Sequence, residues 1–75
     1  MAEQDIPTKQ QLAWAGRAWN RLSARDSGGV AYAAFGGYMA EALEGFMWER
    51  IGTANQVELA KTLLRLEEHL KKAHR

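Results

Sequence analysis

Apolar side chains recur at helical spacing in the first third of the chain. Counting about 100° per residue, one side of residues 8–25 collects the apolar positions of that stretch. These positions are Leu12, Ala15, Ala18, Trp19 and Leu22. Thr8 followed by Gln11 is a capping-box pattern for a helix start, and residues 26–29 have the Asp, Ser and Gly content of a turn. The pattern predicts a first helix over residues 8–25.

A second helix is predicted over residues 30–51, which contain no proline and are apolar around most of the helix circumference. Such a helix must be covered on more than one side. Gly36 lies within it, followed by a second glycine, and each glycine in a helix interior costs about 1 kcal/mol relative to alanine. Ala33, Gly36 and Ala40 either form a flat strip for close helix packing, or the glycines mark a local bend.

The third predicted helix covers residues 55–74 and carries the clearest pattern. Leucines at 4-3-4 spacing form a narrow seam typical of helix packing: they are Leu59, Leu63, Leu66 and Leu70. A second apolar arc contains Val57, Ala60 and Leu64. Either one arc is internal and the other contacts a second copy of the chain, or both belong to one wide core stripe. Self-association through the leucines is the first alternative.

These elements predict an all-α fold, a three-segment antiparallel helical bundle completed by homodimerisation. We expect the 75 residues to form one domain, 1–75, with residues 1–7 as a flexible N-terminus. A core of this size gives little stability. Because the chain has no cysteine and only two histidines, neither a disulfide nor a structural zinc site is expected. Oligomerisation is the remaining common means of stabilisation.

The net charge of +1 is far from the balance of a dedicated nucleic-acid binder, so any charged site must be local. Arg17, Arg21 and Arg25 repeat every fourth residue, and Trp14 lies on the same side of the first helix, opposite its apolar stripe. Tryptophan and arginine are enriched where proteins bind partners, and they also suit single-stranded nucleic acid. The alternative is a solvated charged face with Trp14 at the edge of the core.

Trp48 is the other tryptophan with two interpretations. In the predicted second helix it shares the most polar side with Glu41 and Glu44. It either covers a partner chain or packs against a neighbouring helix of its own chain.

Catalytic and cofactor chemistry find little support. His69 and His74 are confined to the tail of the third helix, Ser23 and Ser27 have no implied catalytic partners, and the glycine pairs lack the lysine of a phosphate-binding loop. The N-terminus has no signal-peptide character, and the longest uncharged run, 27–40, is too short to span a bilayer. We therefore expect a cytoplasmic protein without enzymatic activity, cofactor, metal or membrane partner.

The sequence favours a small protein-binding module, meaning an adaptor, a regulator or a stoichiometric inhibitor, a size class common among accessory and virus-encoded regulators. One alternative is a dimeric nucleic-acid-binding regulator that presents Arg17, Arg21 and Arg25 to phosphate. Another is a structural subunit of a larger assembly.

Overall fold

The computed structural model describes residues 6–73, with side chains described from Ile6 to His69. This part of the chain contains no strand. Its helices are α1 (Lys9–Arg21), α2 (Ala24–Phe35), α3 (Gly37–Leu43), the short 3-10 helix η2 (Trp48–Arg50) and α4 (Thr53–Ala73). The all-α prediction is confirmed, but the prediction of three helical segments is wrong, because four α-helices lie within the described residues.

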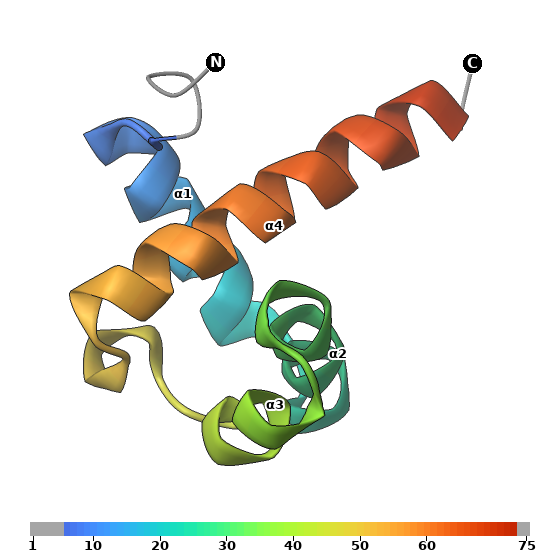
Figure 1. Ribbon diagram of the computed structural model, residues 1–75. Coiled ribbons are helices and arrows are strands. Elements are labelled where there is room, and N and C mark those ends of the chain that lie inside the picture. Colours follow the sequence, from blue (N-terminus) through green and yellow to red (C-terminus); the bar gives the residue numbers. More distant parts are fainter. Residues whose placement is uncertain (1–5, 74–75) are drawn as a thin grey trace.

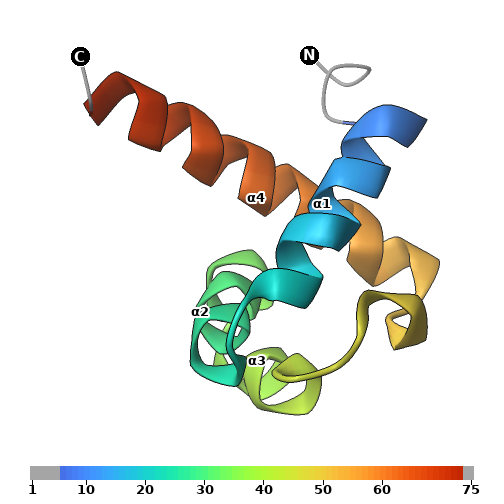
Figure 2. The same ribbon diagram turned by 180° about the vertical axis from the view of Figure 1, so that it is seen from behind.

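The helices form two parts that share one core. Figure 1 shows α4 running diagonally across α1, and the reverse view in Figure 2 shows α1 crossing in front of it. Below this crossing, α2 and α3 fold back on each other, which places Gly45, after the end of α3, against Ala24 at the start of α2. No helix in the described residues is both long enough and apolar enough to cross a membrane.

The first helix begins as predicted and ends four residues early. Thr8 Oγ1 accepts from the backbone N–H of Gln11 (3.1 Å), and the backbone N–H of Thr8 donates to Gln11 Oε1 (2.8 Å), so the capping box is confirmed. The helix ends at Arg21 because Ser23 caps a new one, accepting from the backbone N–H of Asp26 at 3.1 Å. The turn predicted at residues 26–29 is therefore wrong.

Residues 26–29 lie within α2, which starts after the Ser23 cap, and their small side chains allow α3 and the residues after it to pack closely. A methyl group at Gly28 would lie 2.8 Å from the carboxylate oxygen Oε1 of Glu44. The buried hydroxyl of Ser27 donates to the carbonyl of Ala24 and accepts from the backbone N–H of Gly45, both at 3.1 Å. Between α2 and α3, glycine therefore allows close packing at Gly28.

The long second helix predicted over residues 30–51 is wrong because Gly36 interrupts it. Gly36 has a φ of 99°, in the left-handed region, and forms both the end of α2 and the start of α3. No atom lies within 4 Å of where its Cβ would be. Ala33 is exposed and Ala40 is buried, so the flat strip predicted from Ala33, Gly36 and Ala40 does not form.

The core is built around Trp19, which is 1% exposed. Its indole Nε1–H donates to the carbonyl of Phe46 at 2.6 Å, and its ring centroid lies 6.3 Å from that of Trp48. The other buried apolar residues come from every helix: Ala15, Val30, Ala31, Ala40, Leu43, Ile51, Leu59, Ala60 and Leu63. One core therefore holds the hairpin of α2 and α3 to the crossing of α1 and α4.

Candidate protein-binding surface

An open depression lies between the N-terminal half of α1 and the middle of α4. It has a volume of about 280 Å³, and its lining residues are Gln10, Gln11, Trp14, Leu64 and Glu67. Trp14 is half-buried and packs against the edge of the core, and Leu64 is also half-buried. The depression is therefore lined by two apolar side chains together with amide and carboxylate groups.

Helical spacing on both helices builds this depression. Gln10 and Trp14 are one turn apart on α1, and Leu64 and Glu67 are one turn apart on α4. The structure thus brings together Trp14, predicted to contact a partner, and Leu64, predicted to take part in self-association. The sequence places both on spare faces of their helices but contains no signal that these faces meet.

Arg17 and Arg21 continue along α1 from Trp14, and both are exposed. Arg25 is exposed too, but it belongs to α2. The predicted three-arginine stripe on one helix is therefore wrong, because α1 ends at Arg21. Among residues 6–69 the ion pair formed is that of Lys61 with Glu58, at 3.2 Å.

Trp48 lies in the core. The predicted exposed position is therefore wrong, and Trp48 packs against a neighbouring helix of its own chain, as the alternative prediction had it. It is 9% exposed and lies on Gly16 of α1. Its backbone N–H donates to Asn20 Oδ1 at 2.9 Å, and its carbonyl accepts from Gln56 Nε2 at 2.8 Å. Because residues 44–52 are not one helix with α3, the polar side on which the sequence analysis placed Trp48 does not exist.

The leucine seam of α4 is divided between core and surface. Leu59 and Leu63 are buried at 0% and 7% exposure, whereas Leu66 is 42% exposed. The side chain of Leu70 lies outside the described residues. Figure 1 shows the C-terminal half of α4 extending beyond the rest of the domain. Leu59 and Leu63 therefore stabilise the single chain, and of these three leucines only Leu66 offers apolar surface to another molecule.

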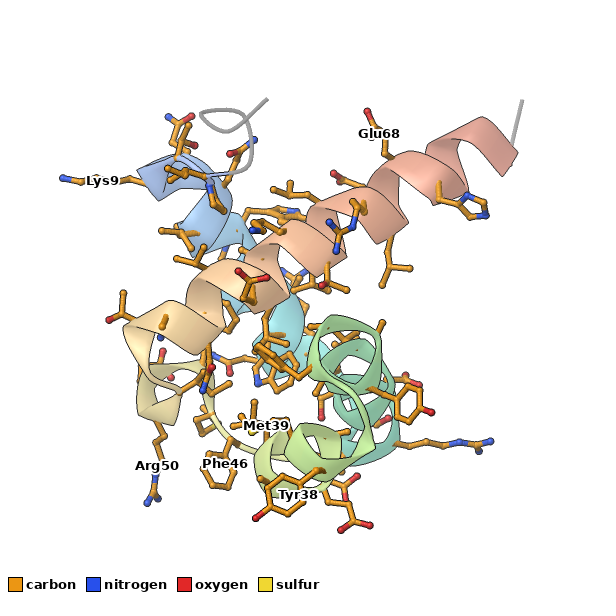
Figure 3. All side chains as sticks on the ribbon, viewed as in Figure 1. Lys9, Tyr38, Met39, Phe46, Arg50 and Glu68 are labelled. Carbon is orange, nitrogen blue, oxygen red and sulfur yellow. The ribbon has the colours of Figure 1, made fainter. Side chains whose placement is uncertain are left out.

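Sequence reasoning missed a group of exposed apolar residues at the far end of the molecule. Tyr38 is 89% exposed, Met47 54% and Phe46 43%, and the Arg50 guanidinium lies 6.0 Å from the Phe46 ring centroid. Figure 3 shows Tyr38, Phe46 and Arg50 at one end of the domain, with Lys9 and Glu68 at the other. We call Tyr38, Phe46 and Met47 the aromatic face. A long helix over residues 30–51 would not have grouped them in this way.

Among the described residues, the side chains considered for catalysis do not come together in the structure. Ser23 caps α2, Ser27 is buried between α2 and α3, and His69 is exposed. His74 lies outside the described residues. Within the part of the chain that is described, no three His, Cys, Asp or Glu side chains come together in a way that suits a metal ion.

Comparisons with known proteins find no matching family model, no matching curated protein and no matching solved structure.

Proposed function

We propose that this chain is a small, non-enzymatic protein-binding module that uses the exposed side of α1 together with the depression beside it. We call this surface the α1 face and define it by Trp14, Leu64, Arg17 and Arg21. The observation that supports the proposal is the meeting of Trp14 and Leu64 at an open depression, with Arg17 and Arg21 exposed one and two turns further along the same side of α1.

The chemistry of the α1 face specifies the kind of partner. A depression of about 280 Å³ accepts one large apolar side chain. The amides of Gln10 and Gln11 can hydrogen-bond to a polar group at the tip of that side chain. Arg17 and Arg21 favour carboxylates nearby, since guanidinium groups pair well with them. The partner surface therefore carries an apolar anchor flanked by acidic residues.

Two arginines on one helix are a small footprint for nucleic acid. Binding that neutralises two phosphates would have a weak dependence on salt concentration, and it would leave the apolar side chains of Trp14 and Leu64 unused. The protein-binding proposal uses all four residues. We also propose a reducing, cytoplasmic setting, because the chain contains no cysteine.

Capture with matched variants tests the proposal. The chain is immobilised and exposed to a nuclease-treated protein mixture. It should retain one protein in an amount about equimolar with the immobilised chain. Arg17→Gln with Arg21→Gln should release it, whereas Lys61→Gln with Arg65→Gln, which removes the same charge from α4, should not. Equal capture by both double variants, or retention of nucleic acid alone, would contradict a protein-binding role for the α1 face.

A further inference from the structure

The aromatic face is an apolar surface that already takes part in a cation–π interaction. Its three side chains come from the start of α3 and from the loop that follows α3. Arg50 already lies over the Phe46 ring at 6.0 Å, a distance at which a guanidinium is attracted to an aromatic face. Tyrosine, phenylalanine and methionine are also enriched at the centres of protein interfaces. The aromatic face therefore suits a partner surface that carries arginine.

Charge is segregated along the chain in a way that matches this surface. The basic residues Lys9, Arg17, Arg21 and Arg25 fall within residues 6–25, which contain no acidic residue. The acidic residues Asp26, Glu41, Glu44 and Glu49 fall within residues 26–49, which contain no basic residue. Residues 6–25 are therefore basic and residues 26–49 acidic, although Glu67 of α4 lines the depression beside the α1 face and Arg50 lies over the Phe46 ring.

One of these carboxylates, Glu41, adjoins the aromatic face, and a second, Glu49, follows it in the sequence. Glu41 lies three residues after Tyr38 on α3, so the two side chains are neighbours on the helix surface, and both are exposed. Glu49 is exposed on η2, beside Arg50. The aromatic face thus has the composition expected of a partner for the α1 face, with an apolar anchor at Tyr38 and an acidic group next to it.

The two surfaces of one chain face in different directions. Trp48 of η2 packs on Gly16, which belongs to the buried side of α1. Arg17 and Arg21 are each two residues from the buried Trp19, so they lie about 160° from it around α1 and are exposed there. The α1 face of one molecule therefore cannot contact its own aromatic face, but it can contact that of another molecule.

We infer that the partner of the α1 face is a second copy of this chain, which inserts Tyr38 into the depression at Trp14 and Leu64 and pairs Glu41 and Glu49 with Arg17 and Arg21. This inference rests on the proposed function and names its partner. The contact joins two different surfaces, so a row of molecules keeps a free α1 face at one end and a free aromatic face at the other.

The size of a stable interface sets the share of the surface that such a contact would use. A stable interface takes about 800 Å² from each partner, roughly a seventh of the chain's 5603 Å² of accessible surface. Because the chain would use two separate surfaces of this size, the assembly grows beyond a dimer as the protein concentration rises. Added salt weakens it, because exposed charge pairs are screened.

Two variants that each lack one surface test the inference. Arg17→Gln with Arg21→Gln removes the basic groups of the α1 face and leaves the aromatic face intact. Tyr38→Ala with Glu41→Gln removes the anchor and one carboxylate, and because both side chains are exposed the fold should be preserved. Circular dichroism checks the fold of each. Tyr32→Ala, at another tyrosine with 65% exposure, is the control for loss of an exposed ring.

Light scattering and sedimentation then give a distinctive pattern. The wild-type chain and Tyr32→Ala should associate beyond a dimer, each double variant alone should need at least about tenfold more protein to associate, and an equimolar mixture of the two double variants should stop at a one-to-one pair. The mixture restores one intact α1 face and one intact aromatic face, and therefore one contact.

A wild-type chain that stays monomeric at millimolar concentration overturns the inference, and so does a mixture that forms no pair. The proposed function is tested separately, by the capture experiment at concentrations where the chain is monomeric. It fails if the loss of Arg17 and Arg21 releases no captured protein. A monomeric chain that still captures a protein through these arginines therefore refutes the second copy as partner and retains the α1 face as a binding surface.

Discussion

The ring of Trp48 lies so close to Gly16 that a methyl group at residue 16 would be 2.7 Å from Trp48 Cδ1. This contact lets η2 lie against α1 and holds Trp48 beside Trp19 in the core. It therefore connects the α1–α4 crossing to the loop that carries the aromatic face.

Gly16→Ala should destabilise the fold. The gain in helix propensity, about 1 kcal/mol, is smaller than the cost of displacing a buried indole, about 1–3 kcal/mol for overpacking. Urea unfolding followed by circular dichroism measures the change. Gly29→Ala is the matched control, because Gly29 is exposed within α2 with open space at its Cβ position, and it should be more stable than wild type. Gly16→Ala at wild-type stability or above would contradict the packing of Trp48 on α1.

Ser27→Ala should cost about 1–3 kcal/mol, the penalty for a buried polar group that loses its partner. The backbone N–H of Gly45 donates to Ser27 Oγ at 3.1 Å and would have no acceptor in the variant. Thr62→Val is a suitable comparison, since the hydroxyl of Thr62 donates to a carbonyl of its own helix, that of Glu58. Ser27→Ala should therefore lower the melting temperature, measured by thermal unfolding, much more than Thr62→Val does. Equal shifts would argue against the Ser27 link between α2 and α3.

The division of the leucine seam predicts two different outcomes along α4. Leu63→Ala should cost about 2–5 kcal/mol because it leaves a cavity in the core. Leu66→Ala, at a position 42% exposed, should change the free energy of unfolding by less than about 1 kcal/mol. Denaturant unfolding of both variants decides this point, and similar losses at the two positions would mean that the seam continues as one buried surface.

Gly36→Ala should destabilise the chain without any steric clash. The φ of 99° at Gly36 disfavours a side chain, while the space around its Cβ position is empty, so the cost is about 1 kcal/mol of backbone strain. Gly37→Ala tests the neighbouring position, where φ is ordinary and a methyl group would approach the Tyr32 ring at 3.3 Å. If Gly36→Ala instead stabilised the protein, α2 and α3 would be one continuous helix in solution.

The sequence indicated the elements whose signals are local. The capping box at Thr8 and the apolar spacing of α1 and α4 identify these helices, because hydrogen bonds and side-chain directions within one or two turns determine them. The end of α1 differed, since Ser23 starts a new helix earlier than the Asp and Gly residues suggested, and α4 starts at Thr53, two residues before the predicted start.

The middle of the chain was less predictable because long-range contacts determine its structure. Gly28 stays helical because Glu44 packs on it, whereas Gly36 breaks the helix where α3 turns back on α2. Periodicity does not distinguish these two glycines. Trp48 is buried because Gly16, far away in the sequence, leaves room for it.

The candidate site was predictable only as separate residues. Trp14, Arg17 and Arg21 were expected on the free side of α1, but the depression also needs Leu64 of α4, and no spacing rule connects the two helices. The aromatic face appears only once residues 44–47 are known to form a loop after α3.

The most direct test of the α1 face as a protein-binding surface is a two-dimensional NMR titration of the ¹⁵N-labelled Tyr38→Ala, Glu41→Gln variant, whose α1 face is intact, with the unlabelled Arg17→Gln, Arg21→Gln variant, whose aromatic face is intact. The indole N–H signals of Trp14, Trp19 and Trp48 act as three local probes, two of them in the core. We predict that the Trp14 indole and the Arg17 and Arg21 amides shift with saturation at one equivalent, while the indoles of Trp19 and Trp48 stay in place. A Trp14 signal that does not move while another surface responds would contradict the account.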